Sequence, residues 1–419
     1  TDGRHDVSVA QSWEYSHTLL RQLISRITTQ CILQSLPMGD FMLFQAPAID
    51  DQEREVLGRI DQLRRALSYA TAARRWTGVL RRMTFARGLQ GSNSIEGYRV
   101  SADDAVAAAA AEAPLEAEGE TWKALVGYRT AMTYVLQLAD DPHVVFSNDL
   151  VRALHFMMLS HDLAKHPGRW RPGPIFVRND ETGERVYEGP DAGLVNDLAA
   201  ELMTWLNEGS ADVHPIVAAA MAHLNLVMIH PFSDGNGRMS RALQTLVLAR
   251  HGVLAPVFSS IEEYLGRYQQ EYYRMLAAVG SASWAPGRDA RPWVRFCLTA
   301  HLRQAATLGR RARVMQRVWE GVEFDVERQG LPDRVVGVLA EAALGLKVRN
   351  ATYRALAGIT ENLASRDLKG LTDAGWLIAV GERRGRVYVA SDDLRKRGDI
   401  AASGESASEP DPFAPPLGQ

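Results

Sequence analysis

The chain has 419 residues, of which 46% are hydrophobic and 23% are charged, and its formal net charge is −3. This length and hydrophobic content are sufficient for two or three domains with buried cores. The near-neutral charge excludes a protein that binds polyanions with its whole surface. The two cysteines, Cys31 and Cys297, lie in apolar helical patterns, so we expect buried thiols in a reducing compartment.

The start of the chain carries little functional information. Residues 1–46 contain a short helical face that Pro37 and Gly39 interrupt, and we expect an N-terminal helical extension that packs on the main domain. The N-terminus lacks the order of charged, apolar and small residues that a signal peptide requires. The chain also has no run of about 18 apolar residues. We therefore expect a cytoplasmic protein with no membrane partner.

The next region is strongly helical and ends in a short polar motif. Apolar residues recur near the helical period from Asp50 to Gly88. The hexapeptide Ser92-Asn93-Ser94-Ile95-Glu96-Gly97 follows, and Gly97 is suited to end a helix in the left-handed conformation. This predicts Glu96 on the last turn of a short helix. Taken alone, the hexapeptide indicates no more than a helix end.

A β-rich segment interrupts the helical pattern between Pro167 and Pro190. Two short β-rich runs, Ile175–Val177 and Arg185–Tyr187, flank a turn that contains Gly183. This pattern predicts a β-hairpin at the surface. A helix then follows, and His214-Pro215 starts the next one.

That helix leads into the most informative stretch, His230-Pro231-Phe232-Ser233-Asp234-Gly235-Asn236-Gly237-Arg238-Met239-Ser240-Arg241. Asp-Gly-Asn-Gly is unsuited to the middle of a packed helix but suited to a tight loop that becomes a helix N-terminus. Glycines allow backbone N–H groups to turn toward a ligand, and the helix dipole favours an anion there. Arg238 and Arg241 are three residues apart and share a helix face. We predict a phosphate site with His230 at its mouth and Asp234 as a metal ligand.

Two aromatic or histidine features nearby are expected to be structural. His223 precedes His230 by two helical turns, and we expect a core histidine that is hydrogen-bonded to the backbone. Tyr264, Tyr268 and Tyr272 recur every four residues, which is typical of one packed helix face.

The C-terminal region has a different pattern. Three short helices and a β-hairpin over 334–390 resemble a winged helix-turn-helix, and this segment has nine Arg or Lys against five Asp or Glu, a balance of +4. The wing carries Arg383, Arg384 and Arg386, so DNA binding and a role in packing or dimerisation both stay open. The residues after about 396 have almost no apolar run and are expected to be a disordered tail.

The central stretch resembles the motif of the Fic family, His-x-Phe-x-Asp/Glu-Gly-Asn-Gly-Arg-x-x-Arg, at every defined position. The hexapeptide ending in Glu96-Gly97 resembles the inhibitory motif Ser/Thr-x-x-x-Glu-Gly/Asn of many Fic proteins. The resemblance implies a mainly α fold with a Fic catalytic region over 47–320 that includes the inhibitory helix and a β-hairpin flap. The C-terminal pattern adds a winged helix-turn-helix over 330–392 and a disordered tail over 393–419.

The resemblance also implies an activity, transfer of AMP from ATP to a hydroxyl side chain of a target protein. His230 is then the general base, Asp234 binds Mg²⁺, and the phosphates are held by Gly235, Asn236, Gly237, Arg238 and Arg241. Glu96 inhibits by pairing with Arg241, and the target binds along the flap near 175–188. A homodimer and DNA remain open as further partners.

Three alternatives accompany this prediction. Family members with an Asn-Lys step in the motif act as kinases, whereas Asn236-Gly237-Arg238 favours AMP transfer. Members with an inhibitory glutamate also remove AMP, with the glutamate, here Glu96, placing a water. The alternative from another class is a DNA-binding transcription regulator that uses its Fic domain as a nucleotide sensor.

Overall fold

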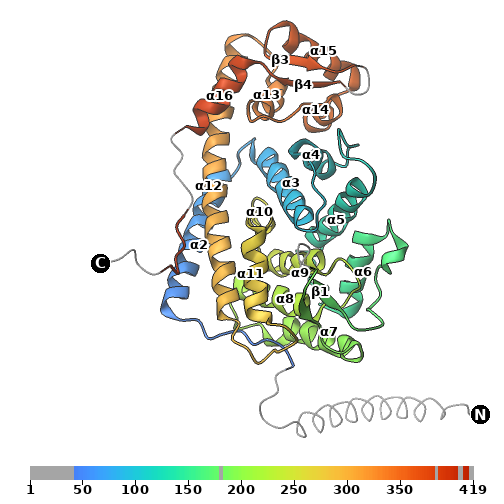
Figure 1. The fold of residues 1–419 in the computed structure, drawn as a ribbon. Helices are drawn as coiled ribbons and strands as arrows, with labels where there is room; N and C mark the ends of the chain where they lie inside the picture. The colour runs from blue at the N-terminus through green and yellow to red at the C-terminus, as the bar shows by residue number, and fades with distance from the viewer. Residues whose placement is uncertain (1–41, 179–182, 383–385, 404–408, 415–419) are drawn as a thin grey trace, which may run out of the picture. The chain divides into compact units, whose positions relative to one another are not determined.

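The computed structural model describes residues 42–178, 183–382, 386–403 and 409–414, and these residues are mainly helical (Figure 1). The expected mainly α fold is confirmed, with two small antiparallel sheets in the described ranges. Of the predicted N-terminal extension, residues 1–41 lie outside the described residues. In the described part of the chain, no helix combines the length and apolar character that crossing a membrane would require.

The helices before the motif are α2 (Asp51–Thr71), α3 (Thr77–Ile95), α4 (Ala102–Ala109), α5 (Gly119–Leu138), α6 (Asn148–Leu159), α7 (Val195–Thr204) and α8 (Pro215–Ile229). Short 3₁₀ helices span Leu163–Lys165 and Ala192–Leu194, and a π-helical turn, Trp205–Gly209, extends α7. The helices after the motif begin with α9 (Asn236–Arg250), α10 (Glu262–Arg267), α11 (Gln269–Gly280) and the long α12 (Arg291–Arg328).

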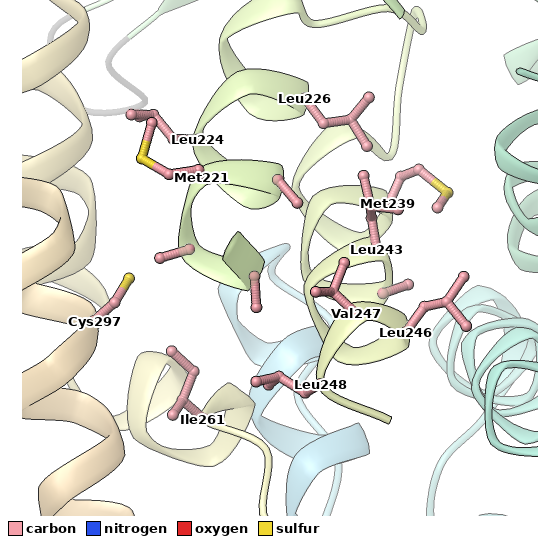
Figure 2. Packing of buried hydrophobic residues seen from close by; sticks show 14 of the residues in the cluster. Met221, Leu224, Leu226, Met239, Leu243, Leu246, Val247, Leu248, Ile261 and Cys297 are labelled. Atoms are coloured by element: carbon pink, nitrogen blue, oxygen red, sulfur yellow. The ribbon is translucent and has the colours of Figure 1, made fainter. Parts of the chain in front are cut away.

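The hydrophobic core next to the motif loop is built around α8 and α9, which pack on each other (Figure 2). Pro215 occupies the first turn of α8, and the His214 side chain accepts a hydrogen bond from the Ile216 N–H, so the predicted helix start is confirmed. Nearly every residue of α8 is buried, which is typical of a helix that is apolar on all sides. The two helices are joined by the motif loop, so a fully buried helix pair holds the loop at its end.

The helical pattern of Asp50–Gly88 forms two helices, α2 and α3. The predicted helix end at Glu96 is confirmed, with Gly97 in the left-handed region (φ 84°), but the helix that ends there is long and not short. A turn with Ala73 in a positive-φ conformation (φ 52°) separates α2 from α3. Helix α3 then continues for 19 residues through Gly88 and Gly91 to Ile95. A Cβ atom on Gly91 would overlap the backbone carbonyl of Glu262 in α10. These glycines therefore allow close helix packing and do not break the helix.

The predicted hairpin is confirmed as β1 (Phe176–Arg178) paired antiparallel with β2 (Arg185–Glu188). Its turn residues 179–182 lie outside the described ranges. The Tyr187 hydroxyl donates a hydrogen bond of 2.6 Å to the Met228 carbonyl, which ties β2 to the end of α8. The backbone of Glu188 also pairs with Ala282 and Trp284. The hairpin is thus fixed next to the motif loop.

The C-terminal region contains the predicted three helices and second hairpin. They are α13 (Val336–Ala343), α14 (Asn350–Ala357), α15 (Glu361–Asp373), β3 (Leu377–Val380) and β4 (Val387–Ala390), and the 3₁₀ helix Asp333–Val335 precedes them. Strands β3 and β4 are antiparallel, and Val348 adds a bridge to Tyr388. Helix α12 is continuous through residue 320, the predicted boundary, so the residues before and after this boundary share one helix.

The prediction of a disordered tail from residue 393 is wrong for its first part, because Asp392–Ala402 form helix α16. Ser391 caps this helix by accepting a hydrogen bond from the Leu394 N–H. Leu394 and Ala401 are buried, and α16 packs against α12 and α13. The few apolar residues of this stretch are spaced on one helix face, which a search for apolar runs does not detect.

Candidate functional site

His230 lies at the C-terminal end of α8, where the chain leaves the helix in the left-handed conformation (φ 52°, ψ 57°). Its Nδ1 lies 3.1 Å from the Val227 carbonyl oxygen and must donate to it, because that oxygen accepts only. Nε2 therefore carries the free lone pair. Desolvation lowers the pKa of His230 to about 4, against the opposing effect of the Val227 carbonyl. At neutral pH the ring is neutral and suited to accept a proton.

The loop after His230 is held by internal hydrogen bonds. Asn236 binds Phe232 twice: its Oδ1 accepts from the Phe232 N–H at 2.9 Å, and its Nδ2 donates to the Phe232 carbonyl at 2.8 Å. The Phe232 ring is fully buried and stacks on His155 at 3.6 Å between centroids. Gly235 has φ 75°, which favours glycine, and a Cβ there would also meet Leu159. The side chain of Asn236 thus shapes the loop, and the backbone N–H groups of the first turn of α9 remain for an anion.

Arg238 is the clearest sign of an anion site. Its side chain is fully buried, yet Nε and Nη1 have no hydrogen-bond partner among the described residues. Its guanidinium lies 5.2 Å from the centroid of the Tyr98 ring. A buried guanidinium without an anion is costly, and a phosphate in the loop would supply the missing acceptors.

Arg241 is already paired. Its Nη2 donates to Glu96 Oε1 at 2.6 Å, its Nε donates to Ser92 Oγ at 2.7 Å, and Nη2 also lies 3.1 Å from the Ser92 carbonyl. Arg241 is 1% exposed and Glu96 is 20% exposed at the side chain. A Cβ on Gly237 would overlap the Glu96 carboxylate, so this carboxylate lies directly against the first turn of α9. The structure brings together the two motifs that the sequence separates by more than a hundred residues.

Asp234 is the residue that could hold a metal. Its Oδ1 accepts a hydrogen bond of 2.6 Å from the Gly235 N–H, and its Oδ2 lies 3.2 Å from Lys165 Nζ. Within the described ranges, no group of three or more His, Cys, Asp or Glu side chains is placed to bind a metal ion. Mg²⁺ is commonly held by one or two carboxylates together with substrate phosphates, so a single carboxylate beside a phosphate site fits a nucleotide-bound Mg²⁺.

Three residues that the sequence did not single out organise this site. Arg171 donates from Nε to the His230 carbonyl at 2.9 Å, and its backbone N–H donates to the Pro231 carbonyl at 2.9 Å. His155 accepts from the Gly168 N–H at Nδ1 and so donates from Nε2 to the Asp234 carbonyl. Lys165 contacts Asp234 as described. None of the three carries a local pattern that marks it, because each acts through a distant segment of the chain.

The structure also answers the two structural predictions for nearby residues. His223 is a fully buried core histidine, as predicted, but its partners are the Gln244 and Tyr272 side chains and not the backbone. The helix that carries the tyrosines breaks at Tyr268, so they do not form one continuous face.

Comparison with known proteins agrees with this geometry. Residues 145–248, which include the loop and α8, match the model of the Fic/DOC family. This part of the chain is therefore similar to the Fic/DOC family. The chain is 28% identical to protein adenylyltransferase Fic of Aedes aegypti over 256 residues. This aligned stretch covers 60% of this chain and 47% of that protein. The chain is 33% identical over 173 residues to protein adenylyltransferase Fic of Drosophila ananassae, covering 41% of this chain and 31% of that protein.

Solved structures show the same fold around the Fic domain. A Fic family protein from Desulfovibrio desulfuricans G20 superposes with a TM-score of 0.53 at 22% identity, covering 83% of this chain and 99% of that chain. A Fic domain containing signaling protein from Bacteroides thetaiotaomicron gives a TM-score of 0.51 at 20% identity, covering 61% and 96%. The chain spans less than half the length of the curated relatives that it matches.

Proposed function

We propose that this chain is a protein adenylyltransferase that transfers AMP from ATP to a hydroxyl side chain of a target protein. The observation that carries the proposal is the buried Arg238 with unpartnered donors, next to a helix N-terminus and a neutral histidine. This combination offers an anion site and a base in one loop. The names of the adenylyltransferase relatives support the same chemistry.

In the proposed step His230 Nε2 takes the proton of the target hydroxyl. The hydroxyl oxygen then bonds to the α-phosphorus of ATP, and the bond from that phosphorus to the bridging oxygen breaks, so that pyrophosphate leaves. The backbone of Gly235, Asn236 and Gly237 and the side chains of Arg238 and Arg241 hold the phosphates. Such transfer depends mainly on positioning and electrostatic stabilisation.

Asp234 is the proposed ligand of the Mg²⁺ that accompanies ATP. The metal would neutralise phosphate charge when bound. The remaining contributions come from the chain itself: Gly235 orients Asp234 through its N–H, and Arg171 fixes the His230 backbone.

The hairpin of β1 and β2 is the proposed docking site for the target protein. Phe176 and Val186 are each 39% exposed, which is high for large apolar side chains in a structured hairpin. An extended peptide could pair with the exposed backbone edge of a strand and so bring a hydroxyl to His230 with little demand on its sequence.

We further propose that Glu96 restrains the transfer. Its ion pair with Arg241 occupies the guanidinium that the γ-phosphate needs, and Ser92 holds the same arginine. Gln269 Nε2 and the Tyr273 hydroxyl both donate to the Ile95 carbonyl, so α11 fixes the end of α3 directly before Glu96. A glutamate in this place can also position a water for the reverse removal of AMP, and both directions then use one site.

The decisive experiment compares ATP labelled at the α-phosphate with ATP labelled at the γ-phosphate, using a Glu96→Gly chain and a cell lysate. AMP transfer labels protein from α-labelled ATP alone, whereas a kinase labels it from γ-labelled ATP. His230→Ala in the same background is the matched control and should abolish the label. Label from γ-labelled ATP alone would refute the proposed reaction.

DNA binding by the C-terminal region is the second candidate function. Arg386 is described at the base of the wing, whereas Arg383 and Arg384 lie outside the described residues. Lys347 pairs with Asp103 and Glu116, and Arg349 pairs with Glu112, so two of the basic residues of this region are neutralised by the catalytic region. These pairs favour a packing role. A mobility shift with duplex DNA at low salt tests the alternative, and binding that weakens when the three arginines become alanine would support it.

A further inference from the structure

Lys165 lies at the end of the 3₁₀ helix Leu163–Lys165, and its ammonium group points at the proposed metal ligand. Nζ is 3.2 Å from Asp234 Oδ2, 2.9 Å from Glu120 Oε1 and 3.1 Å from the Tyr98 hydroxyl oxygen. Glu120 and the Tyr98 hydroxyl accept hydrogen bonds from the lysine, and Asp234 forms an ion pair with it. The side chain is 22% exposed, so these contacts form in a partly desolvated place.

One partner of Lys165, Tyr98, links it to the segment that carries Glu96. Tyr98 follows Glu96 by two residues, and its hydroxyl donates to Glu120 at 3.0 Å. The same Tyr98 ring lies 5.2 Å from the guanidinium of Arg238. One short segment therefore contacts Arg241 through Glu96, Arg238 through the Tyr98 ring, and Lys165 through the Tyr98 hydroxyl.

The ammonium group of Lys165 lies 3.2 Å from Asp234 Oδ2, so a cationic side chain stands on the carboxylate that the metal would use.

We infer that Lys165 is a resident cation on Asp234 that competes with the nucleotide-bound Mg²⁺, and that Tyr98 and Glu120 hold it in this position. This inference rests on the proposed function, since it assumes that Asp234 serves the metal of ATP. It adds a second restraint to that of Glu96. Glu96 pairs with Arg241, which would otherwise bind a phosphate, and Lys165 pairs with Asp234, which would otherwise bind the metal.

The geometry of Asp234 makes the competition direct. Oδ1 already accepts the Gly235 N–H, so Oδ2 is the oxygen that remains for a cation, and Lys165 is on it. Mg²⁺ needs its oxygen ligands at about 2.1 Å, and an ammonium at hydrogen-bond distance from the same oxygen repels it. Binding of the metal therefore requires the Lys165 ammonium to move off Asp234 Oδ2.

The test measures nucleotide binding and not transfer. The dissociation constant of ATP from the full chain is determined by calorimetry, once with excess Mg²⁺ and once with a chelator. The constant with chelator divided by the constant with Mg²⁺ gives the metal coupling. Lys165→Met should raise this ratio roughly 5- to 100-fold, mainly by tighter binding of MgATP. Lys165→Arg, which keeps a charge on Asp234, should leave the ratio near that of the unchanged chain.

Two further variants separate this role from a structural one. Glu120→Gln weakens the hold on Lys165 without touching Asp234 and should move the ratio in the same direction by less. Lys369→Met removes an exposed lysine of α15 and is the matched control, so its ratio should not change. Thermal unfolding of each variant verifies that the fold is intact.

Two results would overturn the inference. Weaker MgATP binding by Lys165→Met would make Lys165 a phosphate ligand, and an unchanged ratio would make its contact with Asp234 irrelevant to the metal. Failure of the proposed function appears separately, as MgATP binding without any AMP transfer in the Glu96→Gly background.

Discussion

Replacing Glu96 by glycine should increase AMP transfer, and the structure indicates how much. The perturbation removes one carboxylate that lies 2.6 Å from a guanidinium that is 1% exposed. A hydrogen bond between charged groups in such a place contributes about 1.5–3 kcal/mol. Because about 1.4 kcal/mol corresponds to a factor of ten, the transfer rate should rise about ten- to a hundredfold.

The remaining contacts of Arg241 decide whether the freed arginine is useful. Ser92 still accepts from Nε through its hydroxyl and from Nη2 through its carbonyl, so the guanidinium keeps its place after Glu96 is removed. Its Nη1 has no partner among the described residues even with Glu96 present. The arginine is thus oriented in advance for an incoming phosphate, which favours a gain in rate and not a collapse of the site.

The assay is transfer of α-labelled AMP to the chain itself and to proteins of a lysate, with folding followed by thermal unfolding. Glu96→Gln keeps the size and the hydrogen-bonding oxygen of the side chain but removes its charge. Its transfer rate should therefore lie between the rates of the unchanged chain and of Glu96→Gly. The gain should vanish when Arg241→Ala is added, because the phosphate then has no partner at this position. A folded Glu96→Gly chain that binds ATP as before and transfers AMP no faster would refute the reasoning.

Three substitutions and one pH profile test other parts of the reasoning. His230→Ala should lower the transfer rate by roughly 10²–10⁴ with little change in melting temperature, and transfer at an unchanged rate would place the base elsewhere. Asp234→Ala should remove the Mg²⁺ dependence of ATP binding in calorimetry, and a preserved dependence would exclude it as the metal ligand. Gly91→Ala should destabilise the fold by about 1–3 kcal/mol in urea unfolding, because the added methyl meets a carbonyl of α10; equal stability would show that the helices can separate there. Burial lowers the pKa of His223 to about 3. Below about pH 6.5 the unfolded chain therefore binds a proton at this residue that the folded chain does not bind, and the free energy of unfolding should fall between pH 6.5 and 3. A free energy of unfolding that stays constant over this range would contradict the argument.

The sequence predicted the parts of the site that are local in the chain. The loop from His230 to Arg241 contains its own glycines, capping groups and cations, so its shape follows from adjacent residues. The pairing of Glu96 with Arg241 could be predicted only through the family resemblance, since spacing alone does not bring α3 to α9. Arg171 and Lys165 could not be predicted, because their partners are carbonyl and carboxylate oxygens of remote segments.

The errors in the predicted fold have the same physical origin. Helix α3 continues through Gly88 and Gly91 although glycine weakens isolated helices. In the structure the tertiary contact with α10 requires small residues there, and the packing stabilises the helix more than the glycines weaken it. Helix α16 was missed for the complementary reason, since its stability depends on burial of Leu394 and Ala401 by α12 and α13.

The same packing restricts how Glu96 can be released. The body of α3 is fixed, because α10 contacts Gly91 without room for a methyl group and α11 holds the Ile95 carbonyl with two hydrogen bonds. Moving α3 as a rigid helix would break all of these contacts, whereas rotating the Glu96 side chain breaks one ion pair. Gly97, with φ 84°, allows the following segment to turn independently of the helix. A signal that relieves the restraint is therefore expected to act on the segment from Glu96 to Tyr98 and to leave α3 in place.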